Sequence, residues 1–299
     1  MSEPPVAGRM KKVAMIVNPI SGFPGGPDRL GPFREALRAG GVELAESRTE
    51  GPGHATELAR EACLRGGDGL LVVGGDGTVN EAVNGMLLGT LPLGTFPTGT
   101  SSILARELRV PFDPLRAATA VAAGHRRRID VGLVNGRRFL AVVGVGWDAH
   151  VVNVVSATRH GHLGKHRYLL PIARAVLDYP FPGLEASLDG GPFAGVRLAF
   201  ACNTRNYAAW FTLAPEARPD DRRLDFVLLS RGSARDMLRW TWGAFSGTLP
   251  RYRETTCAKG RNLVVTATTP VPFQVDGDPG GTTPVRIDLA EETLEVIVP

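Results

Sequence analysis

The sequence predicts an α/β domain whose mostly parallel sheet is covered by helices on both faces, followed by a β-rich domain. Up to about residue 123, short apolar runs typical of buried strands alternate with segments whose apolar residues recur at helical spacing. Beyond the basic run H-R-R-R at 125–128, the chain changes to strand-like runs separated by turn residues. Of the 299 residues, 43% are apolar and 21% are charged, so the chain has room for two modest domains.

The first part of the chain alternates strictly between strand and helix. Strands are expected at 13–17, 42–48, 70–73 and 91–95, and helices at about 28–39, 54–65 and 114–123, with one more beginning near Ser101. Residues 1–10 are expected to form a loose tail. Thr78 and Glu81 have the T-x-x-E spacing of a capping box, so the helix after the third strand is expected to begin at Thr78.

A β-hairpin opens the second part, because the runs 131–134 and 139–145 flank an Asn135-Gly136 turn. Helices are expected at 168–177 and from Met237 to Phe245, and strands at 263–267, 271–275, 285–289 and 294–298. Three histidines and three cations within 159–167 favour a basic loop that meets phosphate or a lipid headgroup over a zinc site. Tyr207, Trp210 and Phe211 line either an acyl-chain entrance or the ordinary core.

The stretch L-L-V-V-G-G-D-G-T-V-N-E at 70–81 predicts a phosphate site. Its glycines lie in a strand-to-helix turn, where the missing Cβ lets backbone approach a ligand and the free N–H groups of the helix start attract anions. Asp76 would repel phosphate unless Mg²⁺ lies between them or the acid handles a proton, and either need indicates phosphoryl transfer. The alternative is an Asp-Gly turn that stabilises a tight loop.

A second acidic motif is D-G-D at 276–278, between two expected strands. In extended chain, alternation would direct the carboxylates of Asp276 and Asp278 to the same side, so that one engages metal-bound phosphate and the other accepts a proton. An Asp-Gly hairpin turn is the alternative, and Pro279-Gly280-Gly281 makes a turn credible.

Four motifs carry a family resemblance. The loop at 74–81 resembles the nucleotide loop shared by lipid kinases and NAD kinases, and N-P-I-S-G at 18–22, P-T-G-T-S-S at 97–102 and V-D-G-D at 275–278 resemble the N-P-x-S-G, P-x-G-T-x-N and D-G-E motifs of the diacylglycerol and sphingosine kinase family. The motifs follow the family's order over nearly the whole chain. NAD kinases lack the late D-G-[ED] motif and carry a separate N-E motif that is not found in this sequence.

The resemblance implies a two-domain fold like that of lipid kinases and NAD kinases, with a C-terminal antiparallel β-sandwich. Residues 11–128 would form the nucleotide-binding α/β domain, which the last strand rejoins at about 286–299. Residues 129–285 would form the β-rich lipid-substrate domain. MgATP would lie in the cleft between the two domains.

The resemblance also implies residue roles. Asp278 or Asp276 would take the proton from a lipid hydroxyl, with Asp76 as a rival base. The nucleotide would contact Asn18, Pro19, Ile20, Ser21, Gly22, Thr49, Gly74, Gly75, Asp76, Gly77, Thr78, Val79, Asn80 and Thr100. A structural Mg²⁺ would be held by Asp221 with backbone groups of Arg218 and Arg223.

Three positions depart from the family pattern. Ser102 and Ile103 stand where the family commonly has Asn and Asp, which leaves the acceptor lipid open. Asp278 is one methylene shorter than the family's Glu. Arg222 replaces a Gly in the metal turn, where a positive φ would cost energy.

The predicted function is therefore that of an ATP-dependent lipid kinase acting in lipid metabolism, with diacylglycerol or a related lipid as acceptor. An NAD-kinase-like phosphotransferase and a non-catalytic binding protein stay as alternatives. The net charge of +4 and pI near 9.2 suit an anionic membrane surface, whereas no nucleic-acid partner is expected and a homodimer stays open.

The cysteines and the hydropathy of the sequence predict where in the cell the protein is found. Cys63, Cys202 and Cys257 form no metal motif or paired spacing, which favours reduced cytosolic thiols. No apolar run approaches about 18 residues, and the apolar run at 13–17 is too short for a signal peptide. A cytoplasmic protein with peripheral membrane association is expected.

Overall fold

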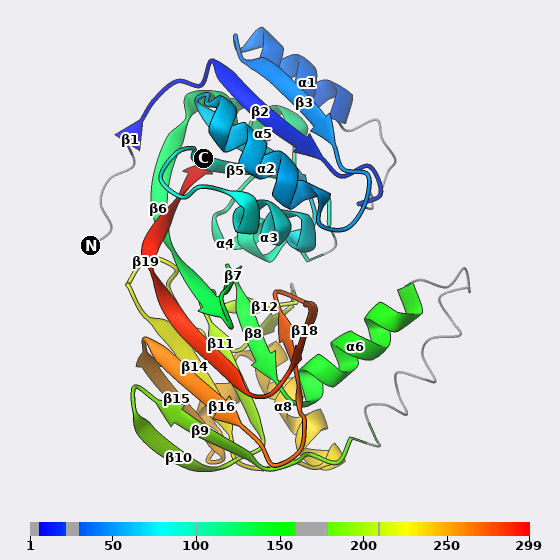
Figure 1. Cartoon of the computed structure of the whole chain (residues 1–299), viewed down its shortest axis with the longest axis vertical. Helices are drawn as coiled ribbons and strands as arrows, with labels where there is room; N and C mark the ends of the chain where they lie inside the picture. Colours follow the sequence, from blue (N-terminus) through cyan, green and yellow to red (C-terminus); the bar gives the residue numbers. More distant parts are fainter. Residues whose placement is uncertain (1–5, 22–29, 100, 160–176, 178, 209) are drawn as a thin grey trace. The chain divides into compact units, whose positions relative to one another are not determined.

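The computed structural model describes residues 6–21, 30–99, 101–159, 177, 179–208 and 210–299. The chain divides into two compact units, the first comprising residues 1–131 and 290–299 and the second residues 132–289. Figure 1 shows the elements in chain colours.

The elements of the first unit, together with the two strands that continue into the second, are β1 (Val6–Ala7), β2 (Lys12–Val17), α1 (Leu30–Ala39), β3 (Glu43–Arg48), α2 (His54–Arg65), β4 (Gly69–Gly74), α3 (Asp76–Gly85), β5 (Leu93–Pro97), α4 (Ile103–Glu107), α5 (Pro114–Ala123), β6 (His125–Val134) and β19 (Val285–Val298). The second unit adds β7 (Arg137–Phe139), β8 (Val142–Val145), α6 (Trp147–Arg159), β9 (Leu184–Leu188), β10 (Gly191–Val196), β11 (Leu198–Cys202), β12 (Asn206–Tyr207), β13 (Phe211–Thr212), β14 (Leu224–Leu229), α8 (Ala234–Ser246), the 3₁₀ turn η3 (Leu249–Arg251), β15 (Thr255–Gly260), β16 (Asn262–Thr266), β17 (Pro272–Val275) and β18 (Asp278–Thr282).

The sheet of the first unit is parallel, with strands in the order β19, β5, β4, β2 and β3. Its central strand β4 is buried along its whole length, which explains why it reads as a continuous apolar run rather than an alternating one. All its carboxyl-terminal strand ends lie at one edge of the sheet, because the strands are parallel. The loops that follow β2, β4 and β5 therefore meet there.

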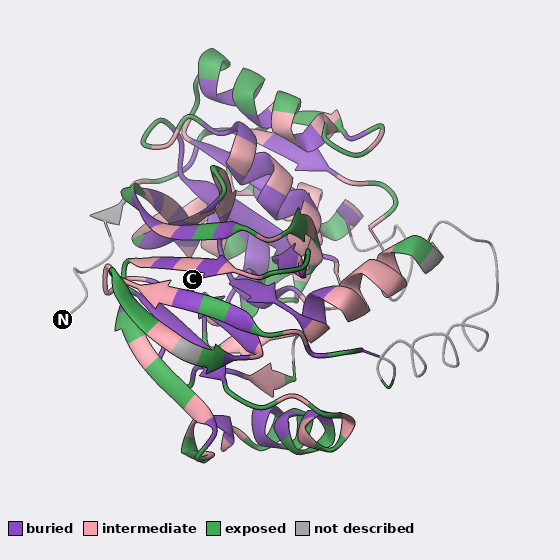
Figure 2. Cartoon of the chain, turned by 60° about the horizontal axis from the view of Figure 1, so that its bottom comes forward, coloured by how far each residue is buried: buried purple, intermediate pink, exposed green. Residues whose placement is uncertain are grey.

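Helices cover both faces of this sheet. Side chains of β2 and β4 such as Met15 and Val73 pack in one core with Phe33 and Leu37 of α1 and with buried residues of α5. The alternate positions face the other way, and α2 and α3 pack together and contact β2 and β4. Figure 2 shows that the strands are mostly buried, while exposed residues follow the outer faces of the helices. The α/β prediction is confirmed.

The second unit is a sandwich of antiparallel sheets. One sheet has the order β15, β14, β11, β8, β17 and β18, and the other runs β10, β9, β16 and β19. A single apolar core is formed from both sheets, with Val143, Ala201 and Phe226 from the first and Leu263 and Ile287 from the second. This arrangement confirms the predicted β-sandwich.

Three sequence expectations are wrong. The strands expected at 285–289 and 294–298 are one continuous strand, β19, of 14 residues. Residues 6 and 7 of the expected tail pair with β6, and Met10 is fully buried. Helix α3 begins at Asp76 rather than Thr78, since its N-cap is Gly75.

Within the described part of the chain, the helices are too short or too polar to cross a bilayer.

Candidate functional site

Three loops at the carboxyl ends of β2, β4 and β5 are joined by side-chain hydrogen bonds. Asn18 Nδ2 donates to Thr78 Oγ1 over 2.8 Å, which links the first loop to helix α3. The hydroxyls of Ser21 and Thr98 lie 2.7 Å apart, and the Thr98 N–H donates to the Gly74 carbonyl over 3.2 Å. The three motif loops are thus brought together as the parallel sheet predicts.

Glycine is required where two of these loops touch. A Cβ on Gly99 would lie 2.8 Å from the Cα of Gly75, and one on Gly74 would lie 2.7 Å from the Thr78 side chain. Real Cβ atoms do not tolerate such distances, so backbone packs directly on backbone. The half-buried peptide groups of Gly75 and Gly99 therefore lie together next to the amino end of α3, an arrangement suited to a phosphate chain.

Asp76 is the first residue of α3, and it is half-buried rather than turned into the interior. Its Oδ1 accepts a hydrogen bond of 2.7 Å from the Ile103 N–H, at the start of α4. Asp76 therefore ties the second loop to the third. The expected capping box is not formed, because no side chain caps this helix and the Thr78 hydroxyl instead accepts from Asn18.

The remaining nucleotide candidates take different positions. The Thr49 N–H donates to the Val17 carbonyl over 2.9 Å, at the same sheet edge. Ile20 is 87% exposed, whereas Asn80 is 1% exposed and accepts from Asn84 within α3. Asn80 would therefore act on a nucleotide only indirectly, by holding helix α3 in place. Gly22 and Thr100 lie outside the described residues, and the contacts of all these residues with ATP stay predictions.

In the second unit, Asp276 and Gly277 form a two-residue hairpin turn. Val275 and Asp278 are paired across it, and both turn residues have positive φ, 50° and 89°. The expectation of an extended chain with both carboxylates on one side is therefore wrong. Asp276 is 8% exposed, and its carboxylate accepts three hydrogen bonds of 2.9 Å from the N–H groups of Leu140, Ala141 and Val142.

Asp278 stands in a different environment on the other side of this turn. It opens β18, its side chain is 41% exposed, and the Arg137 guanidinium lies 3.8 Å away. The Asp278 carboxylate thus stays in contact with solvent, while the lone pairs of the Asp276 carboxylate are engaged by three backbone donors. The geometry thus favours Asp278 over Asp276 as a proton acceptor.

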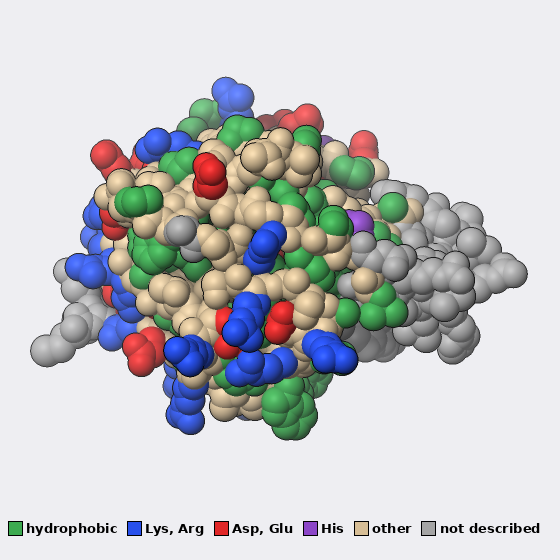
Figure 3. Space-filling model, turned by 90° about the horizontal axis from the view of Figure 1, so that it is seen from below, with side chains coloured by type: hydrophobic (Ala, Val, Ile, Leu, Met, Phe, Trp, Pro, Cys, Tyr) green, Lys and Arg blue, Asp and Glu red, His purple; other side chains and the backbone are tan. Residues whose placement is uncertain are grey.

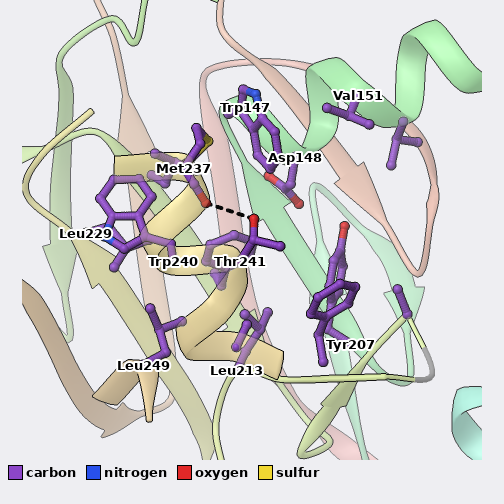
Figure 4. A pocket seen from close by; sticks show the side chains of 16 residues that line it. Trp147, Asp148, Val151, Tyr207, Leu213, Leu229, Met237, Trp240, Thr241 and Leu249 are labelled. Atoms are coloured by element: carbon purple, nitrogen blue, oxygen red, sulfur yellow. Dashed lines mark hydrogen bonds between the residues drawn. The ribbon is translucent and has the colours of Figure 1, made fainter. Parts of the chain in front are cut away.

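An apolar pocket of about 290 Å³ lies within the second unit. Helices α6 and α8 and the strands β11 to β14 contribute its walls, and Figure 4 shows Trp147 from α6 facing Met237, Trp240 and Thr241 from α8. Tyr207 and Phe211 line it as well, whereas Trp210 does not and is 70% exposed. The pocket is near the lower end of the size range of small-molecule sites, about 300–1,000 Å³.

Among the described residues that line the pocket, Asp148 is the one with an acidic side chain. It is 4% exposed, and its Oδ2 accepts a hydrogen bond from Gln274 over 3.2 Å. Burial raises the pKa of Asp148 to about 7. Burial also raises the pKa of Tyr207, whose hydroxyl points toward α6 in Figure 4. Asp148 and Tyr207 thus add a carboxyl and a hydroxyl group to a mostly apolar pocket.

The raised pKa of Asp148 predicts how stability depends on pH. The native state keeps the proton up to about pH 7, while the unfolded chain releases it near the ordinary value of 3.8. The native state therefore binds more protons in this window, and the free energy of unfolding falls as pH rises through it, by up to about 4 kcal/mol. Asp148→Asn should remove this fall, making the variant the more stable form at about pH 8 and not at about pH 4. Urea unfolding across the pH range measures the difference.

Asp68 supplies a control of opposite sign. Hydrogen bonds from the N–H groups of Lys12 and Lys11 lower its pKa, so its contribution is present above the ordinary value and lost as pH falls. Asp68→Asn should therefore destabilise the protein at neutral pH, and its difference from wild type should disappear as pH falls to strongly acid values. Parallel curves for wild type and Asp148→Asn would contradict the assignment of Asp148.

The turn proposed for a structural metal holds an ion pair. Asp221 Oδ2 lies 2.8 Å from the Lys259 ammonium, which is also 3.5 Å from Asp225, and Asp221 Oδ1 accepts from the Arg223 N–H over 3.2 Å. Arg222 has the positive φ, 60°, that the missing glycine would have supplied. Because an ammonium already neutralises this carboxylate, the described geometry does not fit Mg²⁺ at Asp221, and the site stays a prediction from resemblance.

Most of the basic segment expected at 159–167 and most of the helix expected at 168–177 lie outside the described residues.

Two features of the site had no signal in the sequence. Asp148 lies in the stretch G-V-G-W-D-A at 144–149, and no spacing signal relates it to α8. The Ser21–Thr98 contact joins residues 77 positions apart and needed the sheet order to be found.

Two family models match the chain one after the other. The model described as the diacylglycerol kinase catalytic domain matches residues 12–134, and the model described as the YegS C-terminal NAD kinase beta sandwich-like domain matches residues 141–298.

Similar proteins extend over nearly the full length. A diacylglycerol kinase from Bacillus subtilis (strain 168) is 30% identical and covers 97% of each chain, and one from Staphylococcus aureus (strain MRSA252) is 28% identical over 97% of this chain and 93% of its own. A crystal structure from Bacillus anthracis str. Sterne, described as a candidate diacylglycerol kinase, has a TM-score of 0.82 at 25% identity and covers 98% of this chain and 97% of that one. With its linked nucleotide loops, its sandwich and this full-length similarity, the chain belongs to the diacylglycerol kinase family.

Proposed function

We propose that the protein is an ATP-dependent lipid kinase, which transfers the γ-phosphate of MgATP to a hydroxyl of diacylglycerol or a related lipid. The proposal that the acceptor is a lipid rests on the apolar pocket of the second unit. Aromatic and aliphatic side chains from α6 and α8 can surround an acyl chain, and burying such a chain is favourable because apolar surface leaves water.

The polar end of the pocket gives an orientation to the lipid. Asp148 and Tyr207 offer a carboxyl and a hydroxyl group in a wall that is otherwise apolar. A glycerol or amino-alcohol headgroup can form hydrogen bonds with them, while a plain hydrocarbon cannot. The pocket thus favours an amphiphile over a fatty hydrocarbon.

The first unit supplies the phosphate-binding part. The backbone of Gly75 packs directly on that of Gly99, which brings peptide groups of two loops together next to the amino end of α3. Asp76 is the residue that would hold Mg²⁺, since Mg²⁺ in kinases is commonly bound by one or two carboxylates together with the nucleotide phosphates. When bound, Mg²⁺ would reduce the charge repulsion between the phosphates and the acceptor oxygen.

Asp278 is the proposed proton acceptor. An alcohol has too high a pKa to ionise unaided near pH 7, so a carboxylate that removes the proton during phosphoryl loss is needed. Asp276, held by three backbone N–H groups, is proposed to fix the turn from which Asp278 projects. Asp276 is thus a positioning residue.

Location at the cytoplasmic face of a membrane follows as part of the same proposal. Cys63, Cys202 and Cys257 all carry free thiols, which suits a reducing compartment. A lipid acceptor requires contact with a bilayer, and the chain's positive net charge of +4 suits an anionic one.

A lipid-panel kinase assay tests the proposal. Purified protein, labelled ATP and Mg²⁺ are incubated with diacylglycerol, with a sphingoid base and with NAD⁺, and the labelled product is identified. We expect a phosphorylated lipid and no labelled NADP⁺. Phosphorylation of NAD⁺ alone would indicate an NAD-kinase-like enzyme. ATP binding without any product would indicate a non-catalytic relative.

A further inference from the structure

Helix α8 has two apolar faces, and only one of them is packed against the protein. Met237, Trp240 and Ala244 are buried and line the pocket. On a neighbouring flank of the helix, Leu238 is 77% exposed, Trp242 66% and Phe245 55%. A helix at the surface of a soluble domain normally presents polar residues there, so the second face requires an explanation.

The exposed apolar residues form a compact group at helical spacing. Leu238, Trp242 and Phe245 are separated by four and three positions, and the rings of Trp242 and Phe245 are 6.0 Å apart. We call these three residues the outer face of α8. Trp and Phe are the side chains that insert most readily at the boundary between lipid headgroups and acyl chains.

Several exposed arginines lie close in sequence to this face. The segment 231–254 contains five arginines and two acidic residues, and Arg231, Arg235, Arg251 and Arg253 are exposed. Both acids are engaged, because Asp236 is bonded to the capping Ser233 and buried Glu254 is bonded to Arg239. Figure 3, which views the molecule from below, shows hydrophobic side chains beside a group of Lys and Arg side chains.

From this combination we infer that the outer face of α8 is the surface through which the protein docks on an anionic lipid bilayer. Arginines next to inserted aromatic residues are complementary to acidic headgroups above an apolar layer. A second copy of the chain would leave those arginines facing like charge. Three side chains also cover roughly 400 Å², about half of what each partner of a stable dimer buries.

The pocket opens beside the outer face of α8, so docking there would bring the pocket close to the lipid. Thr241 is exposed and also lines the pocket, so the pocket reaches the surface on α8 itself, between its inner and outer faces. A lipid leaving the bilayer beside Trp242 would need to pass only one helix to reach the apolar lining. This use rests on the proposed function, but docking itself requires neither ATP nor catalysis.

Vesicle flotation of the full chain tests the inference. The vesicles are phosphatidylcholine with or without phosphatidylglycerol, and they contain no diacylglycerol. We expect binding only with the anionic lipid, weakened by salt, and about tenfold weaker for Trp242→Ala, since one aromatic anchor is lost. Leu238→Ala should also weaken binding. Leu64→Ala, which truncates a leucine of α2 with 69% exposure, is the matched control and should bind like wild type.

Three outcomes would overturn the inference: unchanged vesicle binding by Trp242→Ala, an equal loss in Leu64→Ala, or a wild-type dimer that Trp242→Ala dissociates while vesicle binding stays the same. Thermal unfolding must show that Trp242→Ala remains folded, which its exposure leads us to expect. Phosphorylation of a short-chain diacylglycerol dispersed in water should be unaffected by Trp242→Ala. Vesicle binding without phosphorylation of any lipid would refute the proposed function and leave the docking surface intact.

Discussion

Replacement of Asp278 by Asn is expected to lower kcat about a thousandfold with diacylglycerol as acceptor, while the KM for ATP changes little. The amide has nearly the shape of the carboxylate but cannot accept the proton of the lipid hydroxyl, and general base catalysis contributes about 10²–10⁴-fold. Asp278 lies at the first position of β18, so the substitution leaves the hairpin turn in place. Steady-state kinetics with labelled ATP measure both constants.

Two variants serve as controls for this prediction. Asp278→Glu restores a carboxylate at the length that the family motif has, and should retain much of the activity. Asp76→Asn should instead raise the Mg²⁺ concentration needed for half-maximal rate, because Asp76 is proposed to hold the ion. If Asp278→Asn stayed active and Asp76→Asn lost the acidic limb of the pH–rate profile, Asp76 would be the base.

Replacement of Gly85 by Ala is expected to destabilise the protein by about 3 kcal/mol or more. A Cβ at this position would lie 1.9 Å from the carbonyl oxygen of Thr56, so backbone of α3 and backbone of α2 would have to separate. Rigid backbone cannot move aside as a flexible side chain does. Since a domain is stable by only about 5–15 kcal/mol, a large part of the margin would be lost.

Gly31 in α1 provides the matched control. No atom is found within 4 Å of a Cβ built there, so Gly31→Ala should be neutral or stabilise the helix by up to about 1 kcal/mol. Urea unfolding of both variants and of wild type measures the difference. Because Gly85 ends the helix that Asp76 begins, Gly85→Ala should also weaken ATP binding at temperatures where it remains folded. Equal stability of the two variants would contradict the close packing of α2 on α3.

The elements of the first unit were predictable because their signals are local. Buried strands such as β4 are continuous apolar runs, and α2 was expected at the residues where it is found. The sequence predicts that α3 begins at Thr78 because the Thr78 hydroxyl could cap the helix. In the structure this hydroxyl instead accepts a hydrogen bond from Asn18, which lies in another loop. Tertiary contact decided where local spacing could not.

The site was predictable only as far as its motifs are continuous in sequence. The four motifs marked the nucleotide loops and the acidic hairpin, but the different environments of Asp276 and Asp278 depend on backbone donors at 140–142. The pocket is assembled from α6, α8 and short strands that are far apart in the chain. No local pattern therefore marks its acidic residue, Asp148, as part of a pocket.

The 14-residue strand β19 has a consequence for biosynthesis. Val285 pairs with β16 in the second unit, and Val296 pairs with β5 in the first, so one strand completes both sheets. It also leaves the ribosome after every other described element. Until then β5 presents an unpaired parallel edge, which is a site where a nascent chain can aggregate. The sheet of the first unit is thus completed only when translation of this strand is finished.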